Sequence, residues 1–456
     1  MISVRTMFWV VLALALCPAV PVRAGGYSLG AAVDAVLRRS PGVAGAGYRV
    51  QEAEAALRQV QMKRLPSLAL ESSFTRSDNP VYAFGTLLDQ KAFTAADFSL
   101  NSLNNPSLQS NFRNYFEVGV PLFTGFELQS HERLGRLGRD AASSGAELAG
   151  QAARYAATEA FLQVVLQREL GRTLAERIAA SESEIESARQ LKARGLVLGS
   201  DFFAAQATLG GLRAWQSKAA AGLAGAKSRL ATLLGEPARS LDAQGGLAYQ
   251  ACPADSEADW LDQALGRRPE LRQSAIQEDM AGVWRRREGY SLLPTVEAFG
   301  AMETDTRDFN GNPWNKMFGV KARLPLGDPG YPARRDRAQA ALEASRAETQ
   351  GAREGVSIEV GQVYQNYRGA CESLPIAKDM VEKAEESLRL FRPLYREGRQ
   401  SIMEVLRAEE GMAKAQAAFL EGLYGVRAGK ARLLLAAGSL DGQAVKDLEK
   451  GLGAAR

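Results

Sequence analysis

The sequence predicts a mixed α and β membrane protein in which very long helices alternate with pairs of short strands. Three observations predict this fold class. The chain repeats its own order of proline and glycine landmarks, two very long stretches carry apolar side chains at helical spacing, and four short runs alternate between apolar and polar side chains. Each pattern is weak alone, and their fixed order along the chain gives them weight.

The composition is that of a folded protein and argues against several classes of function. Of 456 residues, 46% are hydrophobic and 24% are charged, which argues against wholesale disorder. The one histidine, His131, excludes a His-rich metal site, and three cysteines cannot build a four-cysteine site. A net charge of +4 gives no reason to expect nucleic acid as a partner. We therefore expect no catalytic group, no cofactor and no resident metal.

Residues 1–24 have the pattern of a secretory signal peptide. Arg5 precedes an apolar core at residues 7–16 that is too short to span a membrane, and Ala24 permits cleavage after it. The alternative is a lipoprotein signal ending at Cys17, which the bulky residue before this cysteine disfavours. Beyond this stretch, no run approaches the roughly 18 consecutive apolar residues of a transmembrane helix.

The chain repeats itself, with matching landmarks in matching order. Partners lie 228 residues apart for the first two pairs, then 204 and 203 residues apart. The first half therefore carries about 24 extra residues between its second and third landmarks. Each half predicts the same succession of a helix, two strands, a very long helix and a shorter returning helix. The four pairs are Pro41 with Pro269, Pro66 with Pro294, Pro121 with Pro325, and Gly195 with Gly398.

The helical stretches are unusually long. The first is predicted over residues 28–64 and ends before Pro66. A second runs over residues 125–194 without a proline, and about 70 helical residues span about 100 Å. Its counterpart, residues 333–397, contains Pro375, so a kink or break is expected there. Helices of this length indicate a coiled coil or a helical barrel.

Four runs predict strands with one apolar and one polar face. Phe116 and Val118 fall on one side of such a run and Glu117 on the other, which suits either a half-buried soluble hairpin or a barrel wall between lipid and water. Four strands cannot close a membrane barrel, which needs about eight, and an open edge is untenable in lipid. A membrane barrel would therefore be shared between chains, with twelve strands from three copies. The runs are residues 67–76, 113–122, 295–304 and 315–324.

Two turns centred on glycine follow the two very long helices. Together with the duplicated layout and the signal peptide, the turns at residues 195–202 and 395–406 make the chain resemble the TolC-type outer-membrane factor family of efflux and type I secretion systems. The resemblance covers essentially the whole mature chain. It implies a homotrimer with a shared outer-membrane β-barrel of twelve strands, four from each chain, and a long helical barrel, or α-barrel, that crosses the periplasm and tapers at the glycine turns.

The resemblance also implies a division of the chain and a set of partners. After the signal peptide, residues 25–235 form the first structural repeat, 236–255 an equatorial linker, 256–438 the second repeat and 439–456 a C-terminal tail. The partners are a periplasmic adaptor protein, an inner-membrane pump, outer-membrane lipid and exported small molecules or proteins. The chain would be a passive exit duct in the outer membrane of a Gram-negative bacterium. The alternative is a periplasmic coiled-coil adaptor or scaffold.

Five residues are implied as parts of a gate. Asp201 and Tyr395 fall where the family often has a carboxylate–tyrosine link, and Gln400 stands where an arginine is sometimes found. Glu404 falls at an acidic ring that constricts the tunnel, and Arg407 replaces a second acidic ring. The alternative is that Glu404 and Arg407 form only a surface pair at i,i+3.

The glycine turns themselves are implied to contact the adaptor. Gly195 and Gly398 can take a positive φ, which allows a long helix to end and reverse. A plain helix–helix turn without a partner is the alternative. The exposed contacts implied by the resemblance are Leu196, Val197, Gly199 and Ser401.

Two further features leave alternatives open. The enlarged loop at residues 78–111 either folds over the pore mouth or is a solvated loop. Cys252 and Cys371 would both lie near the equator of the tunnel, where the periplasm permits a disulfide. Two free thiols are the favoured expectation, and a bridge is the alternative.

Overall fold

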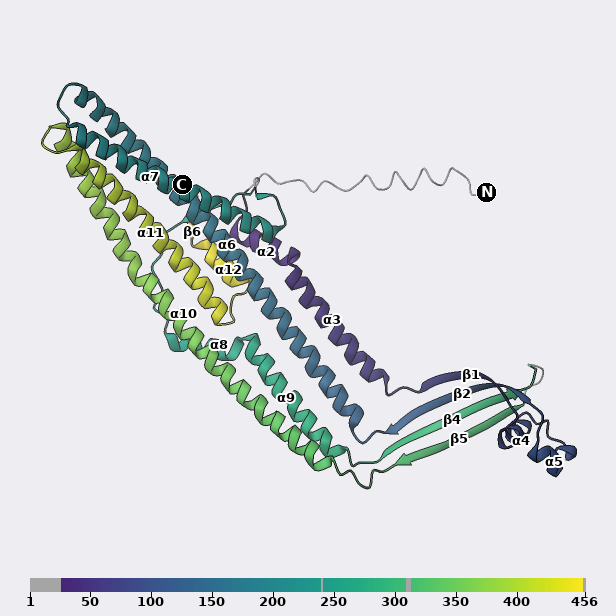
Figure 1. The fold of residues 1–456 in the computed structure, drawn as a ribbon. Helices are drawn as coiled ribbons and strands as arrows, with labels where there is room; N and C mark the ends of the chain where they lie inside the picture. Colours follow the sequence, from purple (N-terminus) through teal and green to yellow (C-terminus); the bar gives the residue numbers. More distant parts are fainter. Residues whose placement is uncertain (1–25, 239–240, 309–312, 454–456) are drawn as a thin grey trace, which may run out of the picture. The chain divides into compact units, whose positions relative to one another are not determined.

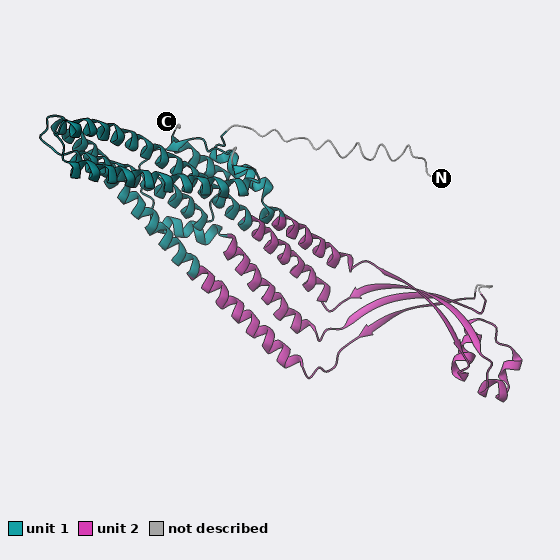
Figure 2. Cartoon of the chain, turned by 45° about the horizontal axis from the view of Figure 1, so that its top comes forward, with its two compact units in different colours: residues 1–44, 148–268, 355–456 teal, residues 45–147, 269–354 magenta. Residues whose placement is uncertain are grey.

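The computed structural model describes residues 26–238, 241–308 and 313–453. The predicted signal peptide at residues 1–24, including Cys17, lies outside the described residues. The chain divides into two compact units, each assembled from separate stretches of sequence (Figure 2). The first unit comprises the described residues of 1–44, 148–268 and 355–456, and the second comprises those of 45–147 and 269–354.

The order of elements confirms the predicted duplication (Figure 1). Each copy has two consecutive helices, two long strands, one very long helix and a returning helix. The first copy consists of α2 (Leu29–Arg39), α3 (Pro41–Met62), β1 (Ser67–Ser77), α4 (Pro80–Asp89), η2 (Ala95–Phe98), α5 (Leu100–Asn104), β2 (Gln109–Phe123), α6 (Glu127–Ala193) and α7 (Gly199–Leu234). The linker strand β3 (Gly246–Leu247) follows. The rest of the chain consists of α8 (Glu257–Arg267), α9 (Pro269–Tyr290), β4 (Thr295–Thr306), β5 (Trp314–Arg323), α10 (Tyr331–Arg396), α11 (Ile402–Ala436), α12 (Gly442–Lys450) and β6 (Leu452–Gly453).

Each copy begins with two helices where the sequence predicts one. The predicted helix over residues 28–64 is interrupted at Ser40, whose backbone is extended because a proline disfavours helical geometry in the residue before it. Pro41 then begins α3, and Ser40 Oγ accepts the amide of Val43 at 3.3 Å, which caps the new helix. Pro269 separates α8 from α9 at the matching place. The prediction of one continuous helix is wrong for this reason.

The two very long helices are present, as expected. α10 continues through both Pro375 and Pro393, so the predicted break is absent. Leu374 beside the first proline is only 2% exposed, and packing therefore holds the helix at this point. Ser373 Oγ also donates a hydrogen bond to the carbonyl of Ala370 at 3.1 Å. A helix thus ends before Pro41, where the preceding serine can cap a new helix. It continues through Pro375, where a buried side chain beside the proline holds the backbone in place.

The four predicted strands form one antiparallel sheet within the second unit, in the order β1-β2-β4-β5. In one row of the register, Leu68 pairs with Val118, which pairs with Gly300, which pairs with Phe318. β1 and β5 are the outer strands of this sheet, and each has one side without a strand partner. The extra residues of the first half form the helices α4, η2 and α5 between β1 and β2.

Two apolar clusters hold the first unit together. One joins α2, α6, α7, α11 and α12, and Phe161 and Leu230 are completely buried in it. The other joins α6, α7, α10 and α11 close to the two glycine turns, where Leu174 and Leu406 are completely buried. The second cluster fixes the helix ends that carry the predicted gate residues.

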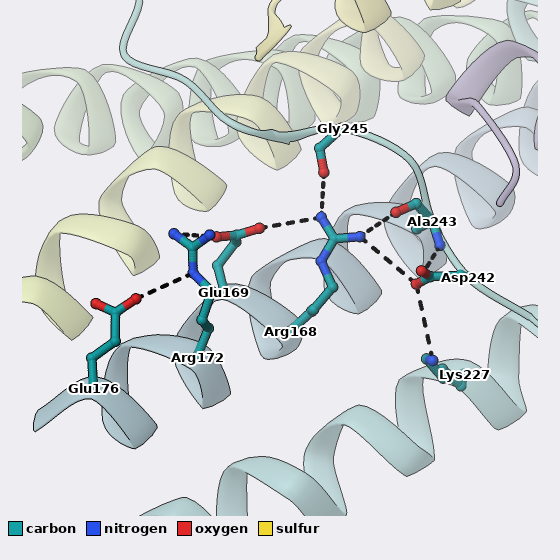
Figure 3. Close-up of polar contacts among 8 residues, drawn as sticks. All are labelled: Arg168, Glu169, Arg172, Glu176, Lys227, Asp242, Ala243 and Gly245. Carbon is teal, nitrogen blue, oxygen red and sulfur yellow. Dashed lines mark hydrogen bonds and ion pairs between the residues drawn. The ribbon is translucent and has the colours of Figure 1, made fainter. Parts of the chain in front are cut away.

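The linker between the repeats is fastened to α6 by one arginine (Figure 3). The Arg168 guanidinium donates hydrogen bonds to the carbonyls of Ala243 and Gly245, and its Nη1 lies 3.7 Å from Asp242 Oδ1. Lys227 of α7 approaches the same carboxylate at 4.0 Å. β3 of the linker pairs with β6 at the end of the chain. The linker and the C-terminal segment therefore form one module on the first unit.

A disulfide joins this linker to the second long helix. Cys252 and Cys371 are bonded, with their Cα atoms 6.0 Å apart and a separation of 119 positions in sequence. The favoured expectation of two free thiols is therefore wrong. Cys371 lies two turns after Tyr364 on α10, and Tyr364 already faces the linker, because its hydroxyl donates to the carbonyl of Asp255 at 2.8 Å.

Candidate functional site

The two glycine turns lie together at one end of the first unit (Figure 1). α6 ends at Ala193, Gly195 takes a φ of +75°, and α7 begins at Gly199. α10 ends at Arg396, and Gly398 takes a φ of +70° before α11 begins. Both glycines therefore have the left-handed backbone that a helix reversal requires and that other residues rarely adopt.

Asp201 is held by the opposite turn, but not by the predicted partner. Ser401 Oγ donates to Asp201 Oδ2 at 2.9 Å and also accepts the amide of Met403, so it caps α11 and links α7 to it. Tyr395 is only 5% exposed, and its hydroxyl has no hydrogen-bond partner among the described residues. Burial raises the pKa of Tyr395, and the Glu184 carboxylate adds to the rise. The predicted carboxylate–tyrosine hydrogen bond is therefore absent, because the phenol points into the apolar cluster.

The predicted constriction residues form a pair on one helix. Arg407 Nη1 lies 2.7 Å from Glu404 Oε1, one turn away on α11, and both side chains are partly exposed. Within one chain this is the i,i+3 surface pair that was the alternative to a pore ring. Gln400 is exposed in the second turn.

The first turn exposes more apolar surface than the sequence predicted. Leu196 and Leu198 are exposed, while Val197 packs against the apolar cluster at the helix ends. Phe203 is also exposed, and the Lys192 ammonium lies 4.3 Å from the centre of its ring. Leu198 and Phe203 were not among the predicted contacts, although both flank the predicted residues in sequence.

A buried carboxylate above the turns was not predicted at all. Glu409 of α11 has a completely buried side chain. Its Oε1 lies 2.5 Å from Arg392 Nη2 of α10, and its Oε2 lies 3.5 Å from Arg177 Nη1 of α6. Arg392 also approaches Glu184 of α6 at 3.6 Å. Glu409 lies four residues after Val405 on the buried face of α11, and this spacing was the signal in the sequence.

The sheet of the second unit has one apolar and one polar face. The register places exposed apolar side chains in alternate rows, and carboxylates and bases in the rows between. Arg113 and Glu303 pair across β2 and β4 at 2.7 Å on the polar face. The apolar face carries Leu68, Leu70, Phe74, Phe116, Phe318 and Val320, and the polar face carries Glu71, Glu117, Glu297, Glu303, Lys321 and Arg323.

The described residues offer no arrangement for a metal ion, since no three His, Cys, Asp or Glu side chains come together as ligands. No helix among the described residues is both long and apolar enough to cross a membrane.

Sequence comparison decides the family. A family model described as outer membrane efflux protein matches residues 32–236 and 260–439, which is most of the chain. The chain belongs to the outer membrane efflux protein family. The efflux protein is therefore an outer-membrane channel component and not an enzyme, and the resemblance to TolC-type factors is confirmed. The alternative of a periplasmic adaptor or scaffold does not fit this family. Among curated proteins, none matches the sequence.

Solved structures share the fold of the efflux protein at low sequence identity. CusC, whose structures were analysed for transmembrane channel formation, is 18% identical in sequence and matches with a TM-score of 0.76. The match covers 91% of this chain and 92% of CusC. VceC of Vibrio cholerae is 16% identical with a TM-score of 0.73, and the match covers 90% of this chain and 96% of VceC. The open-state MtrE channel of Neisseria gonorrhoeae is 17% identical with a TM-score of 0.73, and the match covers 91% of this chain and 90% of MtrE. The predicted fold class of long helices, strand pairs and duplication is confirmed.

Proposed function

We propose that three copies of the chain form a passive exit duct, in which twelve strands share one outer-membrane barrel and the helices form a tunnel across the periplasm. The observation that carries this proposal is the four-stranded sheet with an exposed apolar face and two open edges. Such edges are untenable in lipid unless other strands pair with them. Copies of the same sheet supply β5 as a neighbour for β1 and close the barrel.

The proposed machine is a tripartite efflux or type I secretion system. An inner-membrane pump would provide the energy, and a periplasmic adaptor would dock on the glycine turns. The exposed Leu196, Leu198 and Phe203 support such docking, because apolar side chains exposed together favour contact with a protein partner. We propose the contact set Gly195, Leu196, Val197, Gly199, Gly398 and Ser401.

The decisive experiment isolates the outer membrane from cells that express the full chain and measures the mass of the detergent-extracted particle. A trimer from this fraction supports the shared barrel. A monomer or a dimer, or recovery from the soluble periplasm, contradicts the proposal.

The first prediction concerns cation binding in the tunnel. We propose that Glu404 faces the axis of the trimer, where three carboxylates would attract cations and bind trivalent ones. Glu404→Gln is then expected to abolish block of single-channel current by a trivalent cation and to lower cation selectivity, measured in planar bilayers. Glu397→Gln removes an exposed carboxylate in the second turn and is the matched control. Equal block of the wild type and Glu404→Gln contradicts the pore position.

The second prediction concerns the link between the turns. We propose that Asp201, with Ser401, restrains the helix ends in a closed arrangement, while Tyr395 contributes by packing and Gln400 leaves the outer side of the turn unrestrained. A hydrogen bond to a charged group contributes about 1.5–3 kcal/mol. Asp201→Ala is therefore expected to raise the open fraction of single channels about tenfold or more. Thr208→Ala removes a hydroxyl that donates to the carbonyl of Ala204 within the same helix, at 3.2 Å, and is the control. An unchanged open fraction in Asp201→Ala is the contrary result.

A further inference from the structure

The segment between β1 and β2 contacts the polar face of the sheet at the ends of its strands. Gln90, at the end of α4, donates to Asn111 Oδ1 at 3.0 Å and to the carbonyl of Ser110 at 2.9 Å. Asn315 Nδ2 of β5 donates to the carbonyl of Asp89 at 3.3 Å. Asn111 and Asn315 both lie in the polar rows of the register. The end of α4 is therefore bound to the polar side and not to the apolar side.

This segment is folded, which decides against a solvated loop. Asn79 caps α4 by accepting the amides of Val81 and Tyr82, and Pro80 occupies the first helical position, where its fixed φ suits a helix. Ala83 is completely buried and Thr86 is 4% exposed, so one side of α4 is packed.

Aromatic packing joins the parts of the segment to one another, and a buried polar contact joins the two strands beside it. The rings of Phe84, Phe93 and Phe98 stack edge to face in succession, with centroids 5.0 and 5.8 Å apart, and connect α4 to η2. Beneath the segment, the buried Asn111 Nδ2 donates to Asp305 Oδ1 at 2.5 Å. Figures 1 and 2 both place α4 and α5 beside the same ends of the strands.

The dimensions of the proposed barrel show how much of its opening α4 would fill. Twelve strands about 4.8 Å apart and tilted by roughly 40° enclose a cylinder about 24 Å across between backbones. Three helices, each about 10 Å thick with side chains, fit side by side only within a circle of about 22 Å. One α4 from each chain, lying on the inner face, would therefore occupy much of the opening. The matching connection of the second half, between Thr306 and Trp314, is too short to add another such helix.

We propose that α4 forms a constriction at the outer end of the duct, which passes small solutes and excludes folded proteins. This inference rests on the proposed trimeric duct, because only the shared barrel makes the polar face of the sheet the wall of a pore. The duct then has two narrow places, at the glycine turns and at α4. The size of the exported substrate is limited at α4 even when the turns are open.

The test compares the conductance of single open events, in which the turns are open, between the full-length wild-type trimer and two variants. The first variant replaces residues 80–106 by a short Gly-Ser connection and is expected to raise the conductance at least about twofold by removing the constriction. The second is Leu88→Cys at an exposed position of α4. A bulky maleimide is added from the outer side of the membrane, where the proposal places α4. Labelling is expected to lower the conductance by about half or more. The wild type with the same reagent is the control, because Cys252 and Cys371 are bonded to each other.

The outcomes separate this inference from the proposed duct. If the deletion variant does not assemble, the labelled Leu88→Cys trimer alone decides, because its sheet connection is intact. Unchanged conductance after labelling overturns the constriction and leaves the duct standing. If neither the wild-type trimer nor Asp201→Ala, in which the turns are expected to open, conducts ions, the duct and the constriction are contradicted together.

Discussion

Replacing Glu409 by alanine is expected to lower the free energy of unfolding of the efflux protein by about 2–4 kcal/mol, somewhat less than for a fully buried ion pair, because the Arg177 and Arg392 side chains remain 20% and 36% exposed. The cause lies in the two guanidinium groups that remain. Arg392 Nη2 lies 2.5 Å from Glu409 and Arg177 Nη1 lies 3.5 Å from it. Both arginines would keep their charge without this buried carboxylate, since a guanidinium does not lose its proton in proteins.

The neighbouring residue provides a matched control. Glu410 is partly exposed and pairs with Lys414 one turn away on the same helix. Such exposed pairs contribute about 0.3–0.5 kcal/mol. The midpoint of urea unfolding, followed by circular dichroism of the detergent-solubilised protein, is expected to fall strongly in Glu409→Ala and hardly at all in Glu410→Ala. Similar midpoints in both variants would show that the buried network adds nothing to stability.

The same network connects three helices that meet near the glycine turns. Glu409 lies on α11, Arg392 on α10, and Arg177 and Glu184 on α6. Any movement that separates α11 from α6 must expose or unpair these charges. We therefore expect that Glu409→Ala raises the open fraction of single channels as well as lowering stability, whereas Glu410→Ala leaves the open fraction unchanged.

The sequence predicted what periodicity and repetition determine. The strands, the long helices and the positive φ of Gly195 and Gly398 follow from local spacing and backbone chemistry. The partner of Asp201 does not, because it depends on how far α7 is shifted against α11. Tyr395 lies on α10 and Ser401 caps α11, so the partner depends on how three helix ends pack together.

The effect of a proline on a helix is equally hard to predict from the sequence. Ser40 before Pro41 can cap a new helix, and the chain breaks there. α10 passes Pro375 where Leu374 and Ala377, on either side of the proline, are both buried. The difference lies in tertiary contacts that a single sequence does not display. The covering position of α4 was likewise left open by the sequence, since a loop of that length can fold or remain solvated.

The disulfide should have an effect as large as that of Glu409. Its two cysteines lie 119 residues apart, and closing a loop of about 100 residues removes about 4.7 kcal/mol of chain entropy from the unfolded state in the loop-entropy model. Reduction of the wild type is therefore expected to lower the urea midpoint markedly. The double variant Cys252→Ser with Cys371→Ser is expected to have the same low midpoint and no response to reductant.

The position of the bridge explains why the loss should be local as well as global. Cys252 belongs to the linker, which is also held to α10 by the hydrogen bond from Tyr364 to Asp255, and α8 directly after it is held by that from Gln365 to Glu257, both 2.8 Å long. Hydrogen exchange of the linker amides should accelerate after reduction, while the amides of α7 remain protected. A midpoint and an exchange pattern that do not change on reduction would mean that these hydrogen bonds, together with the Arg168 contacts on α6, hold the linker without the covalent bond. That result would contradict the assigned contribution of the disulfide.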